Sequence, residues 1–144
     1  MSGIGNLFGG MRASSSGLAA ERVRIDTIAR NIANAQTTRM PGTNEPYTRR
    51  VVEFAPILEK LRGGETVTRG VRVSAIIEDR TTPHDLIRDP SHPHANGDGY
   101  VEMPNVNPTK EMADLITAMR AYDANLRVQQ SFVQMAERAL RLAQ

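Results

Sequence analysis

The stretch RNIANAQTT, residues 30–38, closes a long helical pattern with amides, small residues and threonines. Asn31 and Asn34 are three residues apart, so both lie on one face of a helix. Ile32 is the only large apolar residue in the stretch. Amide side chains donate and accept hydrogen bonds, and burying them without partners costs free energy. The stretch therefore predicts a helix end that a neighbouring chain covers while its amides stay hydrogen-bonded, with Asn34 as a C-terminal cap.

Both ends of the chain carry apolar residues at a spacing of seven, which is typical of a coiled coil. Serines and a glycine interrupt the first series and two glutamines interrupt the second, so the two helices bury little when paired only with each other. We predict that these rows form an assembly seam completed by copies of the chain or related chains; an ordinary two- or three-helix bundle is the alternative. The predicted seam residues are Ile4, Leu7, Met11, Leu18, Ile25, Ile28, Ile32, Met112, Leu115, Met119, Tyr122, Leu126, Val133 and Leu140. Polar packing at the helix ends is predicted for Asn31, Asn34 and Asn125.

The middle of the chain has no helical periodicity. YTRRVVEFAP (47–56), GVRVSAIIED (70–79) and GYVEM (99–103) are β-branched or alternate apolar and polar residues, as strands do. GG at 63–64 and NGDG at 96–99 are turn signals. The sequence therefore predicts an α+β fold with a small sheet inserted between two helices. The expected division is an N-terminal assembly helix (1–38), a β-rich middle domain (39–108) and a C-terminal assembly helix (109–144).

Composition narrows the function classes. The chain has 18 basic and 16 acidic residues, a net charge of +2, and no run of basic residues, so a nucleic-acid partner is not expected. It has no cysteine, which excludes disulfides and thiolate chemistry, and no apolar stretch long enough for a membrane span. The first residues lack the features of a cleaved secretion signal, which taken alone favours the cytoplasm. Arg49 and Arg50 could meet anions, although a solvated strand edge is the preferred interpretation.

The segment HDLIRDPSHPHANGDGY (84–100) contains all three histidines of the chain. His92 and His94 could bind a divalent metal together with Asp89 or Asp98. The prolines and glycines around them favour a tight loop instead. The sequence contains no phosphate-binding loop and no nucleophile motif. We therefore expect no enzyme activity, no cofactor and no metal site.

Three segments resemble one protein family. SGLAAERVRIDTIARNIANAQTT (16–38) is similar to the N-terminal signature of the bacterial flagellar rod and hook axial proteins. HPHANGDGYVEMPNVNPTKEMADLITAMRAYDAN (92–125) and PYTRRVVEF (46–54) resemble the proximal rod members of that family. The resemblance covers nearly the whole chain. It departs from the family at GTNEPY, where relatives commonly have a Gly-Gly pair, and at His94, where an acidic residue is frequent.

The resemblance implies a structural subunit that polymerises helically into the proximal rod of the flagellar basal body and transmits torque from motor to hook. The terminal helices are expected to form an antiparallel coiled coil in an inner layer, with the β-rich domain outside. The implied partners are other rod proteins and copies of the chain, and also the export gate or the base near the MS ring. Export is expected through the flagellar type III system without a cleaved signal, which places the chain in the rod across the periplasm, without membrane insertion. A soluble helical adaptor or chaperone-like binding module is the alternative.

Overall fold

The computed structural model describes the backbone of residues 2–60 and 63–142, and the side chains of residues 9–60 and 63–141. The elements follow the order α1 (Ser2–Ala33), β1 (Arg50–Lys60), β2 (Thr66–Glu78), β3 (Leu86–Arg88), β4 (Tyr100–Glu102) and α2 (Pro108–Leu142). Two long helices with antiparallel strands confirm the predicted α+β class. Among the described residues, no helix combines the length and apolar character needed to cross a bilayer.

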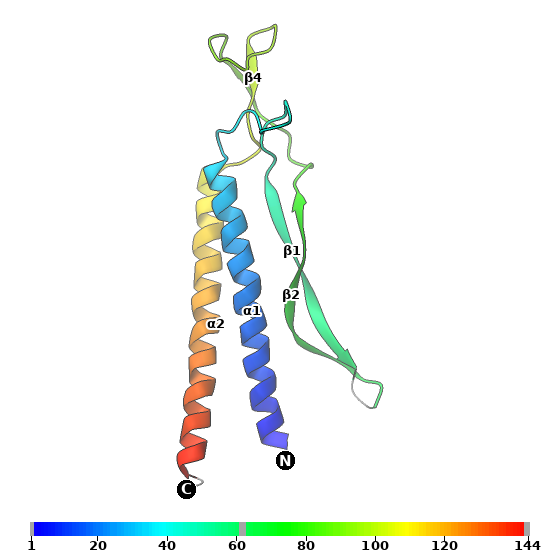
Figure 1. The fold of residues 1–144 in the computed structure, drawn as a ribbon, viewed down its shortest axis with the longest axis vertical. Coiled ribbons are helices and arrows are strands. Elements are labelled where there is room, and N and C mark those ends of the chain that lie inside the picture. Colours follow the sequence, from blue (N-terminus) through cyan, green and yellow to red (C-terminus); the bar gives the residue numbers. More distant parts are fainter. Residues whose placement is uncertain (1, 61–62, 143–144) are drawn as a thin grey trace.

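The two helices lie side by side and run in opposite directions, so both chain ends lie at the same end of the molecule (Figure 1). α2 begins with Pro108, whose fixed φ suits the first helical turn. Asn107 caps this helix, because its side-chain oxygen accepts a hydrogen bond from the Lys110 N–H at 3.1 Å. At the end of α1, the Asn34 side-chain amide donates to the Arg30 carbonyl at 2.9 Å. Local side chains therefore satisfy backbone groups at both of these helix ends.

β1 and β2 form a long twisted hairpin that lies along α1 (Figure 1). Two register shifts interrupt the ladder, and such bulges increase the local twist. The Val71 N–H donates to the Ser16 hydroxyl of α1 at 3.1 Å. Gly70 has a φ of 156°, and an added Cβ there would collide with the Ser16 side chain. The glycine thus permits the hairpin backbone to approach α1 closely.

Three predicted strands are confirmed with shifted ends, and one strand was missed. β1 continues through Pro56 to Lys60, because a proline is tolerated on a strand whose outer edge is not paired. β2 begins earlier than predicted, at Thr66. The prediction of one small sheet is wrong, since the described strands form two separate two-stranded sheets, β1–β2 and β3–β4. The missed strand, β3, has three residues and becomes visible only through its pairing with β4.

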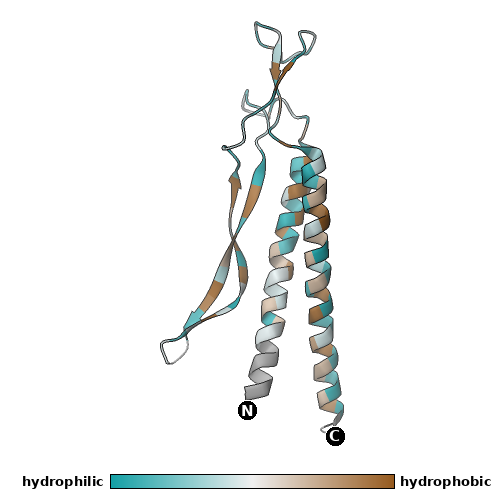
Figure 2. Ribbon diagram, turned by 180° about the vertical axis from the view of Figure 1, so that it is seen from behind, coloured by the Kyte–Doolittle hydropathy of each residue, from teal (hydrophilic) through white to brown (hydrophobic). Residues whose placement is uncertain are grey.

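The buried core is small and partly polar. Its largest fully buried side chains are those of Glu111 and Asn31. Figure 2 shows apolar segments along α2 and both strands of the hairpin, and many of these side chains are exposed. The buried apolar residues are Ala20, Ile28, Tyr47, Val101, Val106 and Ala118.

Candidate assembly interface and its polar junction

Asn31 lies where the end of α1 meets the starts of β1 and α2. Its side chain is fully buried and uses all four hydrogen-bonding positions of the amide. The amide nitrogen donates to the Arg50 carbonyl at 2.8 Å and to Glu111 Oε2 at 2.9 Å. The amide oxygen accepts from the Tyr47 hydroxyl at 2.9 Å and the Arg50 N–H at 3.0 Å. The expectation that a neighbouring chain covers this amide is wrong, because residues of the same chain do so. We call the group Asn31, Tyr47, Arg49, Asn105 and Glu111 the polar junction.

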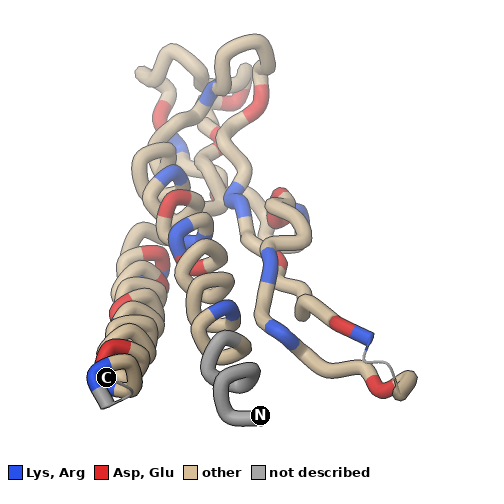
Figure 3. The backbone as a smooth tube through the Cα atoms, turned by 60° about the horizontal axis from the view of Figure 1, so that its bottom comes forward, with Lys and Arg blue, Asp and Glu red and all other residues tan. Residues whose placement is uncertain are grey.

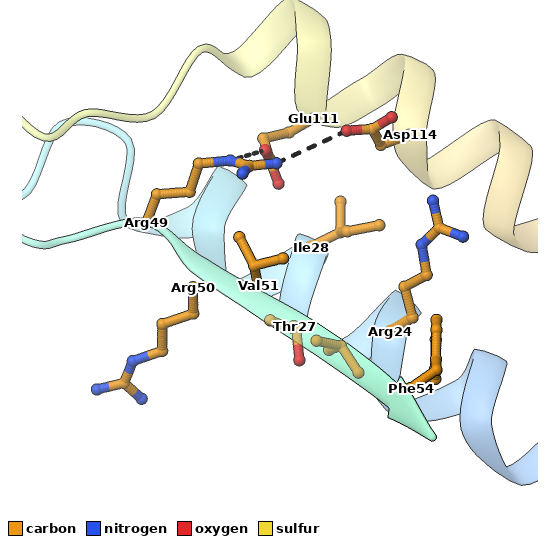
Figure 4. A pocket seen from close by; sticks show the side chains of 10 residues that line it. Arg24, Thr27, Ile28, Arg49, Arg50, Val51, Phe54, Glu111 and Asp114 are labelled. Carbon is orange, nitrogen blue, oxygen red and sulfur yellow. Dashed lines mark hydrogen bonds and ion pairs between the residues drawn. The ribbon is translucent and has the colours of Figure 1, made fainter. Parts of the chain in front are cut away.

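Glu111 is a buried carboxylate in the first turn of α2, and Arg49 pairs with it (Figure 4). Arg49 Nε donates to Glu111 Oε1 at 2.7 Å, and the terminal nitrogens lie 3.6 Å from Asp79 Oδ2 and 3.7 Å from Asp114 Oδ2. A buried carboxylate needs such partners, because removing it from water without compensation is costly. The interpretation of Arg49 as a solvated strand-edge residue is wrong, since its side chain is only 18% exposed and meets these carboxylates.

Asn105 connects the loop before α2 to both strands of the hairpin. Its side-chain oxygen accepts a hydrogen bond from the Arg49 N–H at 2.7 Å. Its amide nitrogen donates to the carbonyls of Asp79 at 2.7 Å and Thr82 at 2.9 Å. The polar junction therefore joins both helices, the start of β1 and the end of β2 through side-chain hydrogen bonds.

Two titratable groups here have shifted pKa values. Hydrogen bonds from Thr81 and Thr82 hold the pKa of the Asp79 carboxyl well below its usual range. Burial raises the pKa of the Tyr47 hydroxyl, against the opposing effect of the Arg50 charge. Tyr47 therefore remains a protonated donor to Asn31, and Asp79 remains charged, at neutral pH.

The contact between the two helices follows a row of small and polar residues. An added Cβ at Gly10 would stand 2.5 Å from the Phe132 ring, and one at Gly17 would stand 3.0 Å from the Asn125 amide nitrogen. From Gly10 to Gly17 and on to Asn31, α1 advances by seven and then fourteen residues. The facing residues of α2 step back by the same numbers, as expected for two antiparallel helices that keep one register. The three contacts that define this row are Gly10 with Phe132, Gly17 with Asn125, and Asn31 with Glu111.

On both helices, the predicted seam row that includes Leu18 and Leu126 lies one residue away from this contact row, whereas the companion row that includes Ile28 and Tyr122 does not. Five predicted seam residues of α2 are 38–69% exposed, namely Met112, Met119, Leu126, Val133 and Leu140. Leu115 and Tyr122 are half-buried. On α1, Ile28 is buried and Met11, Leu18, Ile25 and Ile32 are half-buried, whereas Ile4 and Leu7 lie outside the described side chains. The helix pair alone therefore leaves the α2 part of the predicted seam largely uncovered.

The two other predicted polar residues have different surroundings. Asn34 lies just past the end of α1, where its side-chain oxygen accepts a hydrogen bond from the Thr37 hydroxyl at 3.2 Å. Asn125 was expected near a helix end, but it lies near the middle of α2, half-buried against Gly17.

A cavity of about 230 Å³ lies between α1, β1 and the start of α2 (Figure 4). Ile28, Val51 and Phe54 form its apolar part, and Arg24 and Asp114 add charge. Its residues include the Arg49–Glu111 pair, whose hydrogen-bonding groups are already used by the polar junction. The arrangement suits structural packing, because Arg49 pairs with both carboxylates that line the cavity, those of Glu111 and Asp114.

Hydrogen bonds within the chain hold the histidines in segment 84–100, which was considered above as a candidate metal site. His94 Nδ1 lies 2.7 Å from the Thr38 hydroxyl, and His84 Nδ1 donates to the Met103 carbonyl at 2.9 Å. Within the described ranges, no group of three or more His, Cys, Asp or Glu side chains is placed to hold a metal ion.

Comparisons with known proteins agree with the resemblance noted in the sequence. Residues 11–39 match the family described as flagella basal body rod protein, and residues 98–142 match the flagellar basal body rod FlgEFG protein C-terminal family. The chain is 38% identical over 146 residues to flagellar basal-body rod protein FlgC of Bacillus subtilis, covering 94% of this chain and 97% of that protein. It is 42% identical over 153 residues to FlgC of Borreliella burgdorferi, covering 96% of this chain and 98% of that protein. FlgC of Salmonella typhimurium is 35% identical over 131 residues, covering 91% and 93%.

Proposed function

The chain belongs to the family of flagellar basal-body rod protein FlgC, and from this premise we propose that its helix pair is the part that builds the rod. The chain is a structural subunit of the basal-body rod, and the family is one of structural proteins, not of enzymes. It works in the basal body, in assembly with other rod components.

The helices α1 and α2 form an antiparallel coiled coil. α1 ends at Ala33, inside the proposed assembly segment 1–38, α2 begins at Pro108, one residue before the proposed segment 109–144, and segment 39–108 is carried beside the pair. The matched steps from Gly10 to Asn31 and from Phe132 to Glu111 support a single register. The polar junction holds the start of the hairpin against both helices. It thereby transmits force between the helix pair and the middle segment.

The observation that carries this proposal is the exposed apolar row of α2, which runs from Met112 to Leu140. Fully burying one such side chain stabilises by about 1.5–3 kcal/mol. Because each is already partly covered, burying five contributes on the order of 5 kcal/mol before the costs of association. The row is therefore a lateral contact surface, which neighbouring rod subunits cover together with the α1 seam that includes Ile4 and Leu7.

The remaining assignments rest on the family. The subunit joins copies of itself and other rod proteins in a helical polymer of the proximal rod, which transmits torque from motor to hook. Contacts that join two different surfaces of neighbouring subunits produce such an open helical assembly, because they need not close into a ring. The subunit leaves the cell interior through the flagellar type III system, adjoins the export gate or the base near the MS ring, and lies in the periplasmic part of the basal body.

Leu126→Asp tests the lateral surface. Leu126 is 38% exposed in the single chain, so the substitution should leave the fold intact. It should block rod completion, because the charge would be buried between subunits. Ser131→Asp is the matched control and should assemble normally, because Ser131 is exposed on α2 and lies five residues from Leu126, on a different face of the helix. Complementation of a deletion strain, read by motility and by microscopy of basal bodies, distinguishes the two. Normal rods with Leu126→Asp would remove the row from the interface between subunits.

A further inference from the structure

A second cavity, of about 350 Å³, lies between α1, the hairpin and the middle of α2. Small residues of α1, together with Phe54 and Val71 of the hairpin, form most of its wall, and Glu21 is the one charged residue that lines it. The cavity opens to the surface, where Phe54 and Thr68 are exposed. Since one water molecule needs roughly 10–15 Å³ of cavity volume, there is room for a whole side chain of another protein.

Glu21 places a carboxylate in this cavity, and its charge is poorly compensated. The side chain is only 16% exposed, and Glu21 Oε2 is buried without a hydrogen-bond donor among the residues that the structure describes. The ion pair that this oxygen makes with Arg24 Nη1, at 3.9 Å, is too long for a hydrogen bond. Removing a carboxylate from water is costly unless donors and an opposite charge replace the water. The single chain therefore holds a buried acceptor that a further cation would satisfy.

The arginines of the chain that lie near this cavity have other partners or positions. Figure 3 shows basic segments on both α1 and the hairpin. Arg24 lines the neighbouring cavity of about 230 Å³ (Figure 4). Arg69 lies between two lining residues of β2, but its Nε donates to Glu59 Oε2 at 2.7 Å. Neither arginine donates a hydrogen bond to Glu21, so a donor from a second protein can take that place.

We propose that this cavity receives an arginine side chain from a rod protein other than this one, and that Glu21 pairs with its guanidinium. A guanidinium carries five N–H donors in a planar fork and is more weakly hydrated than an ammonium, so it suits a largely buried carboxylate. The carboxylate turns easily about its last side-chain bond, which brings either oxygen toward the incoming donor. The Asn125 amide oxygen on α2 can accept a further hydrogen bond.

The apolar wall suits the rest of an arginine side chain. The methylene groups of arginine pack on apolar surface while the charged end makes polar contacts, and Val71 provides such surface here. Phe54 is 40% exposed in the single chain, and an aromatic ring attracts a nearby guanidinium. The cavity therefore offers both parts of the side chain a matching environment.

The inference rests on the proposed rod function and adds a partner for one site of the subunit. Members of this family assemble with other rod components, which makes a different rod protein the source of the arginine. The contact is a charge pair in a cavity, whereas the α2 row is an apolar surface. Different substitutions therefore test the two contacts.

Glu21→Gln separates a contact between proteins from a role within the chain. In the free chain the change removes a poorly compensated charge, so the urea midpoint of unfolding should stay the same or rise. In a deletion strain complemented with the variant, the number of complete rods should fall about tenfold, because the incoming arginine loses its counter-charge. A residue that only stabilised the fold would lower both measurements together.

Glu21→Arg and its revertants identify the partner. The new arginine should block rod completion, because it would repel the incoming one. Asp98→Arg makes the same charge change at an exposed loop position and is the matched control, which should assemble normally. Selection for restored motility should yield changes in another rod protein that replace one arginine by an acidic or neutral residue.

Complete rods with Glu21→Gln would overturn the inference, as would a loss of free-chain stability that accompanies the loss of rods. Revertants confined to this chain would overturn it too, since the arginine would then not come from another rod protein. If Glu21→Arg does not fold, the Glu21→Gln results decide alone. In each of these cases Leu126→Asp would still block the rod and the proposed function would stand, whereas complete rods in the deletion strain would end the proposed function itself.

Discussion

Replacing Asn31 with alanine should be among the most destabilising single substitutions in this chain. The change removes four hydrogen bonds and leaves Glu111 Oε2, the Tyr47 hydroxyl and both backbone groups of Arg50 without their partner. A buried polar group that loses its partner costs about 1–3 kcal/mol. Because water entry and local relaxation recover part of this, the predicted loss is about 3–5 kcal/mol. Urea unfolding of the purified chain, followed by the helical circular-dichroism signal, measures it.

Asn34→Ala is the matched control, because that side chain makes local, more exposed hydrogen bonds at the same helix end. It should cost less than about 1 kcal/mol. Asn31→Asp alone should also destabilise, since it sets a carboxylate against Glu111; adding Glu111→Gln should recover part of the loss by restoring an acid–amide pair. A loss for Asn31→Ala equal to that of Asn34→Ala would refute the reasoning.

Three further predictions concern the hairpin, the pH dependence and the helix ends. Gly70→Ala should cost about 1–3 kcal/mol in the same assay because of its backbone conformation and its contact with α1, whereas Gly63→Ala, whose added Cβ meets nothing within 4 Å, should change little; equal effects would contradict this. The folded-state pKa of Asp79 lies below its ordinary value of 3.8, so its contribution is full at neutral pH and is lost as the pH falls below that value. Asp79→Asn should therefore lower stability at pH 7 and flatten the acid-induced decrease below about pH 4; an unchanged pH profile would contradict it. Trypsin should cleave the dilute chain after Arg138 before it cleaves after Arg49, because the polar junction holds Arg49 in place. Mass spectrometry of the first fragments measures this order, and earlier cleavage after Arg49 would contradict the prediction.

The fold class and the positions of both helices could be predicted because long apolar repeats at a spacing of seven are a local signal. The row that joins the helices could not be found in the same way. It contains Gly10, Gly17 and Asn125, which are small or polar, so the apolar pattern selected the neighbouring row. Gly17 was interpreted as an interruption of the apolar series, whereas it allows the Asn125 side chain to approach.

The polar junction was predicted in part. The amides of RNIANAQTT indicated a buried, hydrogen-bonded helix end, and Asn31 is such a residue. Its partner Glu111 is 80 residues away in the sequence, and no local pattern connects them. Arg49 was misinterpreted for the same reason, because a strand sequence does not reveal which distant carboxylates lie beside it.

Electron microscopy of basal bodies from a strain that lacks this chain tests the central claim most directly, with a complemented strain as control. The account predicts rings without a completed rod or hook in the deletion strain, and normal rods after complementation. Complete rods and hooks in the deletion strain would contradict it.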